Sequence, residues 1–228
     1  MKRGKINLIL GPMFSGKTSL LILRYKKYTI GGKKCLMVKY KKDIRYDEEK
    51  IVTHDNIKVS ATICECLSEI DDRVKSYDVI CIDEIQFYKD AYIFCDKWAI
   101  EGLIIEACGL NGTFERKPFK MISRLLPQTE NIIFLKAICI KTGKDASFTK
   151  RLTKEEDKEI IGGIEMYNSE DRNTFYADES ILKKHYNYKF RKFLKINGYD
   201  EELLNSFNKK LNDLNFNCPQ NIIFKEYV

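Results

Sequence analysis

Residues 11–18 read Gly11-Pro12-Met13-Phe14-Ser15-Gly16-Lys17-Thr18, which matches the pattern G-x-x-x-x-G-K-[ST] of a phosphate-binding loop. An apolar run, residues 6–10, precedes the loop as a buried strand would. Glycines let the backbone curl so that its N–H groups point at phosphate oxygens, and the N-terminus of a following helix also favours an anion. The stretch therefore predicts a strand, a P-loop and a helix, with all eight residues 11–18 at a nucleotide site.

A second chemical feature is the pair Asp83-Glu84, which ends an almost continuous apolar run from residue 78. Such a run is typical of a parallel strand covered on both faces, and ligands of open α/β sheets bind beyond the carboxyl ends of their strands. We expect Lys17 to reach the β- and γ-phosphates of ATP, and Thr18 and Asp83 to hold Mg²⁺. Glu84 is the candidate general base, because a phosphoryl transfer needs an acceptor for the attacking hydroxyl's proton.

Expected strands and helices alternate along the first 138 residues. Further strands are expected at 34–40, 103–108 and 132–138, and helices at 17–30, 63–75, 89–101 and 121–126. This alternation predicts the α/β class, with a parallel P-loop sheet and flanking helices. We divide the chain into a kinase domain (1–135), a small domain (136–180) and a helical C-terminal extension (181–228).

The composition describes a globular protein, with 44% hydrophobic and 32% charged residues among 228. The basic N-terminus precedes an apolar run that ends at Leu10, too short for a signal peptide or a membrane span, so we expect a cytoplasmic protein without membrane contact. The eight cysteines contain no C-x-x-C pair and are expected as free thiols. The formal net charge is +7, but residues 181–199 contain six Lys and Arg and no Asp or Glu, so the excess belongs to one segment.

Several further motifs, in the same order and spacing, closely resemble the type II thymidine kinases, the cellular and poxvirus kind. They are the P-loop above, Asp83-Glu84-Ile85-Gln86-Phe87, the stretch 109–119 (GLNGTFERKPF), Thr149-Lys150-Arg151-Leu152 and Ile161-Gly162-Gly163. The resemblance covers residues 5–178. It implies ATP-dependent phosphorylation of the 5′-hydroxyl of thymidine, with Glu84 as proton acceptor, a homotetramer, and feedback inhibition by thymidine triphosphate.

The resemblance also implies a thymidine pocket, and flat Phe faces suit a nucleoside base. Positions that match the pocket are Met13, Phe87, Leu110, Phe114, Phe119 and Tyr167. Positions that match the lasso, the segment that covers the substrate, are Thr149, Lys158, Glu159, Ile160, Ile161 and Gly162. Asp43 and Arg45 match a loop near the phosphates and the 5′-hydroxyl. For the segment 116–118 a solvated loop is an open interpretation, and no chemistry is assigned to it.

One departure from the family concerns zinc, which these kinases usually hold with two C-x-x-C or C-x-x-H pairs at the lasso. Only Cys139 is retained here, while Thr142, Asp171 and Thr174 occupy the other three positions. Structural zinc takes four ligands, mostly Cys and His, so no zinc is expected. Apolar contacts are expected to join the two ends of the lasso instead, from Ile138, Ile140, Phe148 and Phe175.

The C-terminal extension and the activity each have a second interpretation. Residues 181–199 mix basic and aromatic side chains, which fits a nucleic-acid surface, although an amphipathic helix with a solvated basic face is the commoner cause. Residues 204, 207, 211 and 214 form an apolar helical stripe. For the activity, the alternatives are a P-loop ATPase or switch protein, and a nucleoside-binding relative without kinase activity.

Overall fold

The computed structural model describes residues 3–43, 50–52, 58–152 and 166–177. The chain divides into two compact units, residues 1–175 and 176–228. Nearly all of the second unit lies outside the described residues, and so does every expectation about the C-terminal extension. The division at residue 135 between a kinase domain and a small domain stays a prediction.

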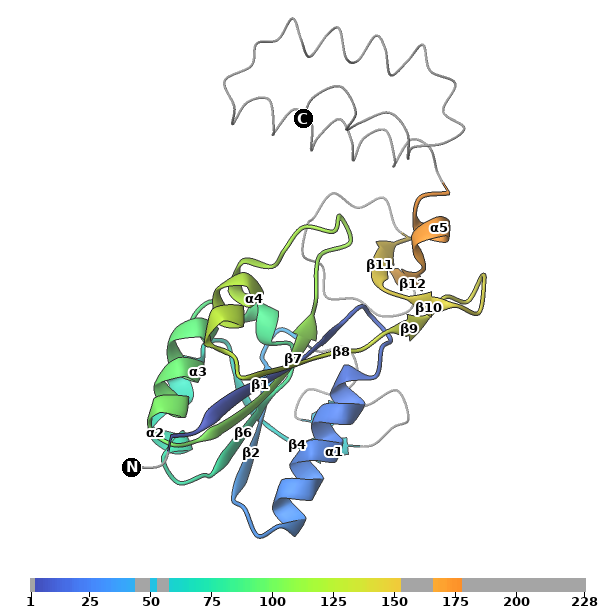
Figure 1. Ribbon diagram of the computed structural model, residues 1–228. Coiled ribbons are helices and arrows are strands. Elements are labelled where there is room, and N and C mark those ends of the chain that lie inside the picture. The colour runs from blue at the N-terminus through green and yellow to red at the C-terminus, as the bar shows by residue number, and fades with distance from the viewer. Residues whose placement is uncertain (1–2, 44–49, 53–57, 153–165, 178–228) are drawn as a thin grey trace, which may run out of the picture. The chain divides into compact units, whose positions relative to one another are not determined.

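A six-stranded parallel sheet organises the first unit, with the strand order β5-β2-β6-β7-β1-β8 (Figure 1). The strands are β1 (Lys5–Gly11), β2 (Cys35–Tyr40), β5 (Thr62–Cys64), β6 (Val79–Ile82), β7 (Ile104–Leu110) and β8 (Asn131–Phe134). All four side chains of β6 are buried, as expected for a strand covered on both faces. The parallel sheet predicted from the sequence is confirmed.

Helices cover both faces of this sheet. On one face lies α1 (Lys17–Ile30), whose Leu21 and Ile22 pack against β1, β2, β6 and β7. On the other lie α2 (Asp71–Val74), α3 (Ala91–Ile100) and α4 (Lys120–Leu125), around the fully buried Trp98. The short 3₁₀ helices are η1 (Leu67–Ile70), η2 (Ile85–Phe87) and η3 (Leu126–Gln128). The cores on the two faces are separate, because successive side chains of a strand alternate between them.

The expected helix over residues 63–75 is wrong in its first part. Ile63 lies in β5 and pairs with Lys39 of β2, and the helical path begins only at Leu67, after Cys66 as the N-cap. The expectation followed an apolar period, but pairing with β2 at the sheet edge satisfies the backbone groups of residues 62–64. An antiparallel pair of β3 (Lys50–Val52) and β4 (Lys58–Ser60) also lies between β2 and β5, where the sequence analysis expects no strand.

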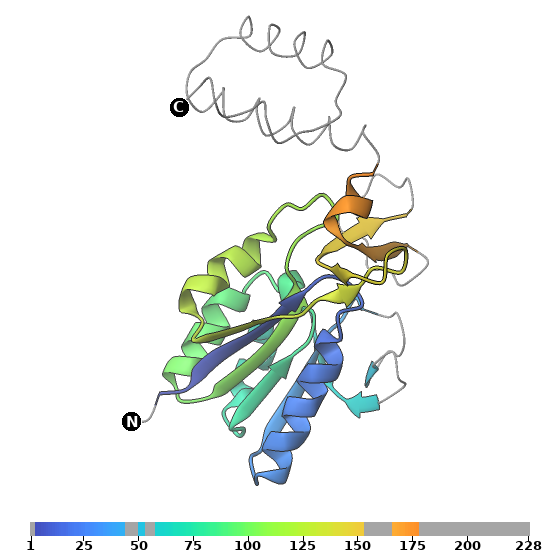
Figure 2. The same cartoon turned by 45° about the vertical axis from the view of Figure 1, so that its right-hand side comes forward.

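Beyond β8 the chain forms two small antiparallel ladders. One joins β9 (Ala137–Ile138) to β10 (Asp145–Ala146), and the other joins β11 (Phe148–Arg151) to β12 (Tyr167–Glu170). The last described helix is α5 (Arg172–Phe175). In Figures 1 and 2 these elements, coloured yellow and orange, lie beside the connection from β1 to α1. The P-loop and the β11–β12 ladder, which carries Thr149, are therefore neighbours.

Candidate active site

The P-loop connects the carboxyl end of β1 to the N-terminus of α1 through an unusual backbone path. Gly16 has φ +78° and Phe14 has φ +60°, both in the left-handed region. Gly11 is required by a close approach, because a Cβ there would lie 2.6 Å from the carbonyl oxygen of Leu135 and from Ser15 Oγ. The chain thus curls in the way that directs backbone N–H groups toward an anion.

Lys17 lies within this loop rather than on the surface. Its side chain is buried, and its Nζ donates a hydrogen bond to the Pro12 carbonyl oxygen at 2.6 Å. Lys26 of the same helix, by contrast, is exposed. The loop therefore holds a cation at the position where the sequence predicts contact with the phosphates.

Asp83 directly follows β6 and faces the start of α1. The Thr18 hydroxyl lies 3.3 Å from Asp83 Oδ1 and 3.4 Å from Oδ2. Asp83 Oδ1 also accepts hydrogen bonds from the Glu84 N–H at 3.1 Å and from the Cys108 thiol at 2.8 Å. Burial, reinforced by the charge of Asp83, raises the pKa of Cys108 well above its usual value, so Cys108 acts as a neutral donor. These contacts fix the Asp83 carboxylate beside Thr18.

Glu84 adopts a left-handed conformation, with φ +51°, and is buried. Gln86 Nε2 donates to Glu84 Oε2 at 2.6 Å, while Gln86 Oε1 accepts the Leu110 N–H at 3.1 Å. A Cβ at position 109 would lie 2.4 Å from Gln86 Oε1, so a residue other than glycine there would displace the Gln86 amide. The left-handed conformation of Glu84 costs about 1–3 kcal/mol for a residue other than glycine, and it persists only where the surrounding structure imposes it. Gln86 thus connects the orientation of the Glu84 carboxylate to the end of β7.

An aromatic group adjoins these carboxylates. Phe87 stacks on Tyr40 with ring centroids 5.3 Å apart and an interplanar angle of 25°, and meets Phe119 edge to face at 6.4 Å and 80°. Phe119 is buried, and Phe87 and Leu110 pack against the same core. Asp43 is also buried, and its N–H donates to the Tyr40 carbonyl oxygen. Tyr40, for which the sequence gives no signal, therefore links the predicted pocket residue Phe87 to the loop that carries Asp43.

Phe114 and Tyr167, two other predicted pocket residues, meet through Arg151. The Arg151 guanidinium lies 3.9 Å from the Phe114 ring centroid and 5.5 Å from that of Tyr167, and it donates to the Tyr167 hydroxyl at 2.9 Å. A cation over an aromatic face is attracted by the ring's quadrupole. The loop after β7 is thereby attached to the β11–β12 hairpin.

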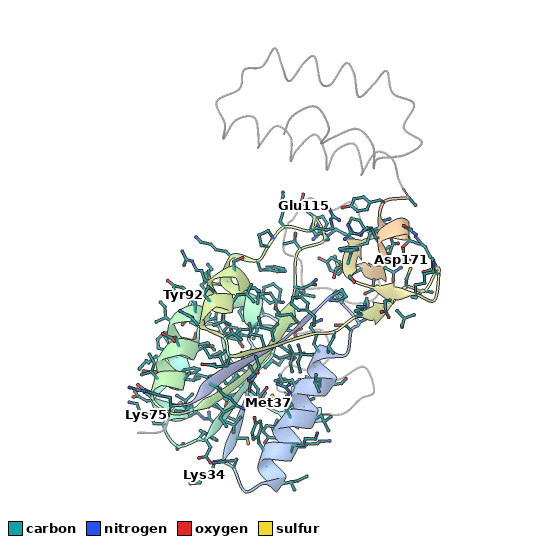
Figure 3. All side chains as sticks on the ribbon, viewed as in Figure 1. Lys34, Met37, Lys75, Tyr92, Glu115 and Asp171 are labelled. Atoms are coloured by element: carbon teal, nitrogen blue, oxygen red, sulfur yellow. The ribbon has the colours of Figure 1, made fainter. Side chains whose placement is uncertain are left out.

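The neighbouring Arg116 makes a second attachment of this kind, which gives the segment 116–118 a contact role. Its guanidinium lies 5.3 Å from the Phe148 ring centroid and 5.7 Å from that of Phe175. In Figure 3 the loop that carries Glu115 reaches toward these elements. Arg45 and residues 158–162, the remaining predicted site residues, lie outside the described part of the chain.

The hairpin also contacts the P-loop backbone. The Met13 N–H donates to Thr149 Oγ1 at 3.0 Å, and the Ser169 hydroxyl donates to the Met13 carbonyl oxygen at 2.5 Å. Thr149 was predicted as a site residue on family resemblance, whereas Ser169 was not. The sequence carries no local signal for either contact, because they join positions 136 and 156 residues apart.

The four residues at the family's zinc positions lie together and form hydrogen bonds. Thr142 Oγ1 donates to Asp171 Oδ2 at 2.5 Å, the Thr174 N–H donates to Asp171 Oδ1 at 2.9 Å, and Cys139 Sγ lies 3.4 Å from Thr174 Oγ1. Asp171, labelled in Figure 3, stands at the start of α5. These hydrogen bonds, that from Thr142 foremost, lower the pKa of Asp171 below its usual value. A carboxylate with two donors thus occupies the centre of the cluster.

The prediction of apolar contacts near this cluster is confirmed for two phenylalanines and wrong for two isoleucines. Phe148 and Phe175 pair with ring centroids 5.5 Å apart, as predicted. Ile138 and Ile140 are 59% and 76% exposed, so the prediction that they join the two ends of the lasso is wrong. Polar groups and a phenylalanine pair hold this region together, because the two isoleucine side chains face solvent.

The Thr18–Asp83 pair is the part of the site that could hold a metal ion. Within the described ranges, no group of three or more His, Cys, Asp and Glu side chains could hold a metal ion. A magnesium ion at a nucleotide needs fewer protein ligands, since it takes one or two carboxylates together with phosphates and waters. The Asp83 carboxylate and the Thr18 hydroxyl supply the hard oxygen donors that this ion prefers. Their pairing fits Mg²⁺.

A buried polar network supports the site from inside the sheet. Glu106 of β7, which is 1% exposed, accepts hydrogen bonds from Asn7 of β1 and from Arg24 and Tyr28 of α1. Burial, followed by the charge of Glu106, raises the pKa of Tyr28 to about 12. The sequence pattern predicts an apolar strand over residues 103–108 and gives no signal for a role of this carboxylate. It joins α1 to β1 and β7, two of the strands whose ends carry the site.

No helix in the described part of the chain is both long enough and apolar enough to cross a membrane.

Comparison with known proteins identifies the relatives of this chain. A sequence model described as thymidine kinase matches residues 4–175. The thymidine kinase of sheeppox virus (strain KS-1) is 45% identical over 178 residues, which cover 78% of this chain and 100% of the relative. Thymidine kinase 1 of Dictyostelium discoideum is 41% identical over 181 residues, 78% of this chain and 80% of the relative. The thymidine kinase of raccoon poxvirus is 46% identical over 175 residues, 77% and 98% of the two chains.

Proposed function

This chain belongs to the thymidine kinase family, whose members use ATP to phosphorylate thymidine, and on that premise we propose the roles of its residues in the reaction. The γ-phosphoryl group of ATP is transferred to the 5′-hydroxyl of thymidine, and the hydroxyl proton passes to Glu84. The observation that carries this proposal is the meeting of Lys17, Thr18, Asp83 and Glu84 at the carboxyl edge of the sheet.

The P-loop, residues 11–18, would hold the phosphates of ATP. Its backbone N–H groups and the N-terminus of α1 favour the anion, and Lys17 would exchange its contact with the Pro12 carbonyl for one with the β- and γ-phosphates. The ammonium is attracted more strongly by an ionised phosphate than by a neutral carbonyl, because the phosphate adds the attraction between opposite charges, so this exchange is favourable. Thr18 and Asp83 would hold Mg²⁺, which neutralises developing phosphate charge when bound.

Glu84 suits the role of proton acceptor because its position is fixed from two sides. Its own backbone is held in the left-handed region, and Gln86 binds one carboxylate oxygen, Oε2. An acceptor with a fixed orientation does not have to be ordered during the reaction. Asp43, together with Arg45, would lie near the 5′-hydroxyl and the phosphates.

The thymine base would lie among the aromatic side chains. Phe87, supported by Tyr40 and Phe119, supplies one ring face, and Phe114, held by Arg151, supplies a second aromatic wall. Met13, Leu110 and Tyr167 would complete the pocket. Backbone groups of residues 158–162, in the segment between β11 and β12, would read the base edge. Thymidine triphosphate would inhibit by placing its own base in this pocket and its phosphates toward the P-loop.

The sheet edge at β8 supports assembly into a homotetramer. β8 is the last strand of the sheet, and its Ile132 and Phe134 are 42% and 63% exposed. An exposed edge strand with apolar side chains is a surface on which another chain can pair.

The decisive experiment measures ATP consumption and product formation against a panel of deoxynucleosides. The proposal expects ADP and thymidine monophosphate in equal amounts, with thymidine the preferred acceptor. A rate of ATP hydrolysis that no nucleoside changes would instead identify an ATPase or switch protein. Thymidine binding without turnover would identify a binding-only relative.

A further inference from the structure

The peptide groups on either side of Met13 in the P-loop form hydrogen bonds with one pair of facing residues of the β11–β12 hairpin. Thr149 and Ser169 are register partners across the two strands. Thr149 accepts the Met13 N–H at 3.0 Å, and Ser169 donates to the Met13 carbonyl oxygen at 2.5 Å. All three residues are buried, with Ser169 only 1% exposed. Water therefore does not compete for these hydrogen bonds.

The Ser169 hydrogen bond acts where the P-loop backbone is most constrained. The Met13 carbonyl belongs to the peptide unit that precedes Phe14, whose φ of +60° is in the left-handed region. Rotation about that φ turns the carbonyl, so a donor that fixes the carbonyl also favours the left-handed conformation. The Phe14 side chain packs against Ala137, Cys139 and Ala146 of the neighbouring ladder and its loop. Backbone and side chain of the strained segment are thus both supported from outside the P-loop.

The same hairpin reaches the proposed nucleoside pocket two residues away along each strand. Arg151 and Tyr167 form its last register pair and carry the contact with Phe114. The β11–β12 hairpin therefore contacts the P-loop through the Thr149–Ser169 pair and the proposed nucleoside pocket through the Arg151–Tyr167 pair.

We infer that Ser169 is a positioning residue for the P-loop, and that its hydrogen bond to Met13 couples nucleoside binding to ATP binding. The inference rests on the proposed function, since it assumes that both ligands bind at the assigned places. A nucleoside that binds against Phe114 and Tyr167 restrains the hairpin and, through Ser169, the Met13 carbonyl, so less conformational freedom is left for ATP to remove. By linkage, ATP raises the affinity for thymidine by the same factor.

The test is the coupling ratio, the Kd of a non-hydrolysable ATP analogue without thymidine divided by its Kd with saturating thymidine. Titration calorimetry on the full chain gives both values. We expect a ratio of about five or more for the wild type, the lower end of typical couplings. Ser169→Ala should bring the ratio close to one. Ser169→Cys keeps nearly the same size but donates weakly, so its ratio should lie between the two.

The matched control is Ser76→Ala. Ser76 also donates its hydroxyl to a backbone carbonyl, that of Arg73, but on the exposed surface after α2. The Ser76→Ala variant should have the same coupling ratio as the wild type. If Ser169→Ala does not fold, as judged by its thermal transition, Ser169→Cys carries the test.

Two results would overturn the inference, a wild-type ratio near one and a folded Ser169 variant with an unchanged ratio. A wild type that binds neither the ATP analogue nor thymidine would instead overturn the proposed function on which the inference rests.

Discussion

Thr18 and Asp83 are 65 residues apart in the sequence, yet the Thr18 hydroxyl lies 3.3 Å and 3.4 Å from the two carboxylate oxygens of Asp83. The contact brings the first turn of α1 to the end of β6, with Cys108 of β7 as a second donor to Asp83. Because Glu84 is the next residue, the same contact sets the distance between the phosphate loop and the proposed proton acceptor.

Glu84→Gln should lower kcat by about 10²–10⁴-fold, the usual contribution of a general base, while the affinity for ATP changes little. The amide has nearly the same shape as the carboxylate but accepts the hydroxyl proton poorly. Steady-state kinetics and nucleotide titration measure the two quantities. Glu101→Gln, at an exposed residue after α3, is the matched control. A Glu84 variant with most of the wild-type kcat would refute the assignment.

Lys17→Ala should weaken ATP binding by about tenfold or more and lower kcat as well, since a charge-assisted hydrogen bond contributes about 1.5–3 kcal/mol. The two effects should appear together, unlike those of Glu84→Gln. Lys26→Ala removes an exposed lysine from the same helix and should change neither. Unchanged ATP affinity in the Lys17 variant would contradict the P-loop assignment.

The purified protein should contain well under one zinc per chain. Cys139 and Asp171 are the only conventional zinc ligands among the four residues of the cluster, and the Asp171 carboxylate already accepts hydrogen bonds from Thr142 and Thr174. Elemental analysis measures the content, and EDTA should leave the Tm unchanged when Mg²⁺ and nucleotide are absent. Near-stoichiometric zinc with Cys139 as a ligand would show that the prediction is wrong.

Asp171 should stabilise the fold in a pH-dependent way. Its pKa is lowered in the folded chain, so its contribution is present above the unfolded pKa of about 4 and is lost as pH falls through the lower folded value. Asp171→Asn should therefore lower the free energy of unfolding at neutral pH, and the gap to the wild type should narrow below about pH 4. Denaturant unfolding at several pH values measures this gap. Asp72→Asn, at an exposed residue of α2, is the control. A gap that is constant with pH would exclude the ionised carboxylate as its cause.

The protein should be larger in solution than its chain mass of 26.8 kDa. Light scattering coupled to size exclusion measures the mass, and a tetramer is the expected species. Phe134→Lys places a charge on the exposed edge strand β8. If that edge takes part in subunit assembly, the variant should form smaller oligomers than the wild type. Exposed Lys26→Glu on α1 serves as a charge-change control away from that edge. A monomer at working concentration would contradict the proposed assembly.

Several features of this protein are determined by short stretches of sequence. The P-loop pattern at 11–18 and the acidic pair after a buried strand each combine a local backbone requirement with a residue type, so they can be recognised without the fold. The apolar runs of β1, β6 and β7 likewise predict a doubly covered parallel sheet, because burial on both faces leaves no polar alternation. The local pattern also located α1 and α3.

Only the tertiary structure decided which polar groups complete the site. Ser169 meets Met13 across 156 residues, and Gln86 meets Leu110 across 24, with Gly109 making room. Residue type alone does not distinguish such a serine or glutamine from a solvated one, since each can hydrogen-bond anywhere on a surface. Ile63 shows the same limit for the fold, because its strand exists through pairing with β2. Burial makes these contacts obligatory, and burial is a property of the packed chain rather than of any segment.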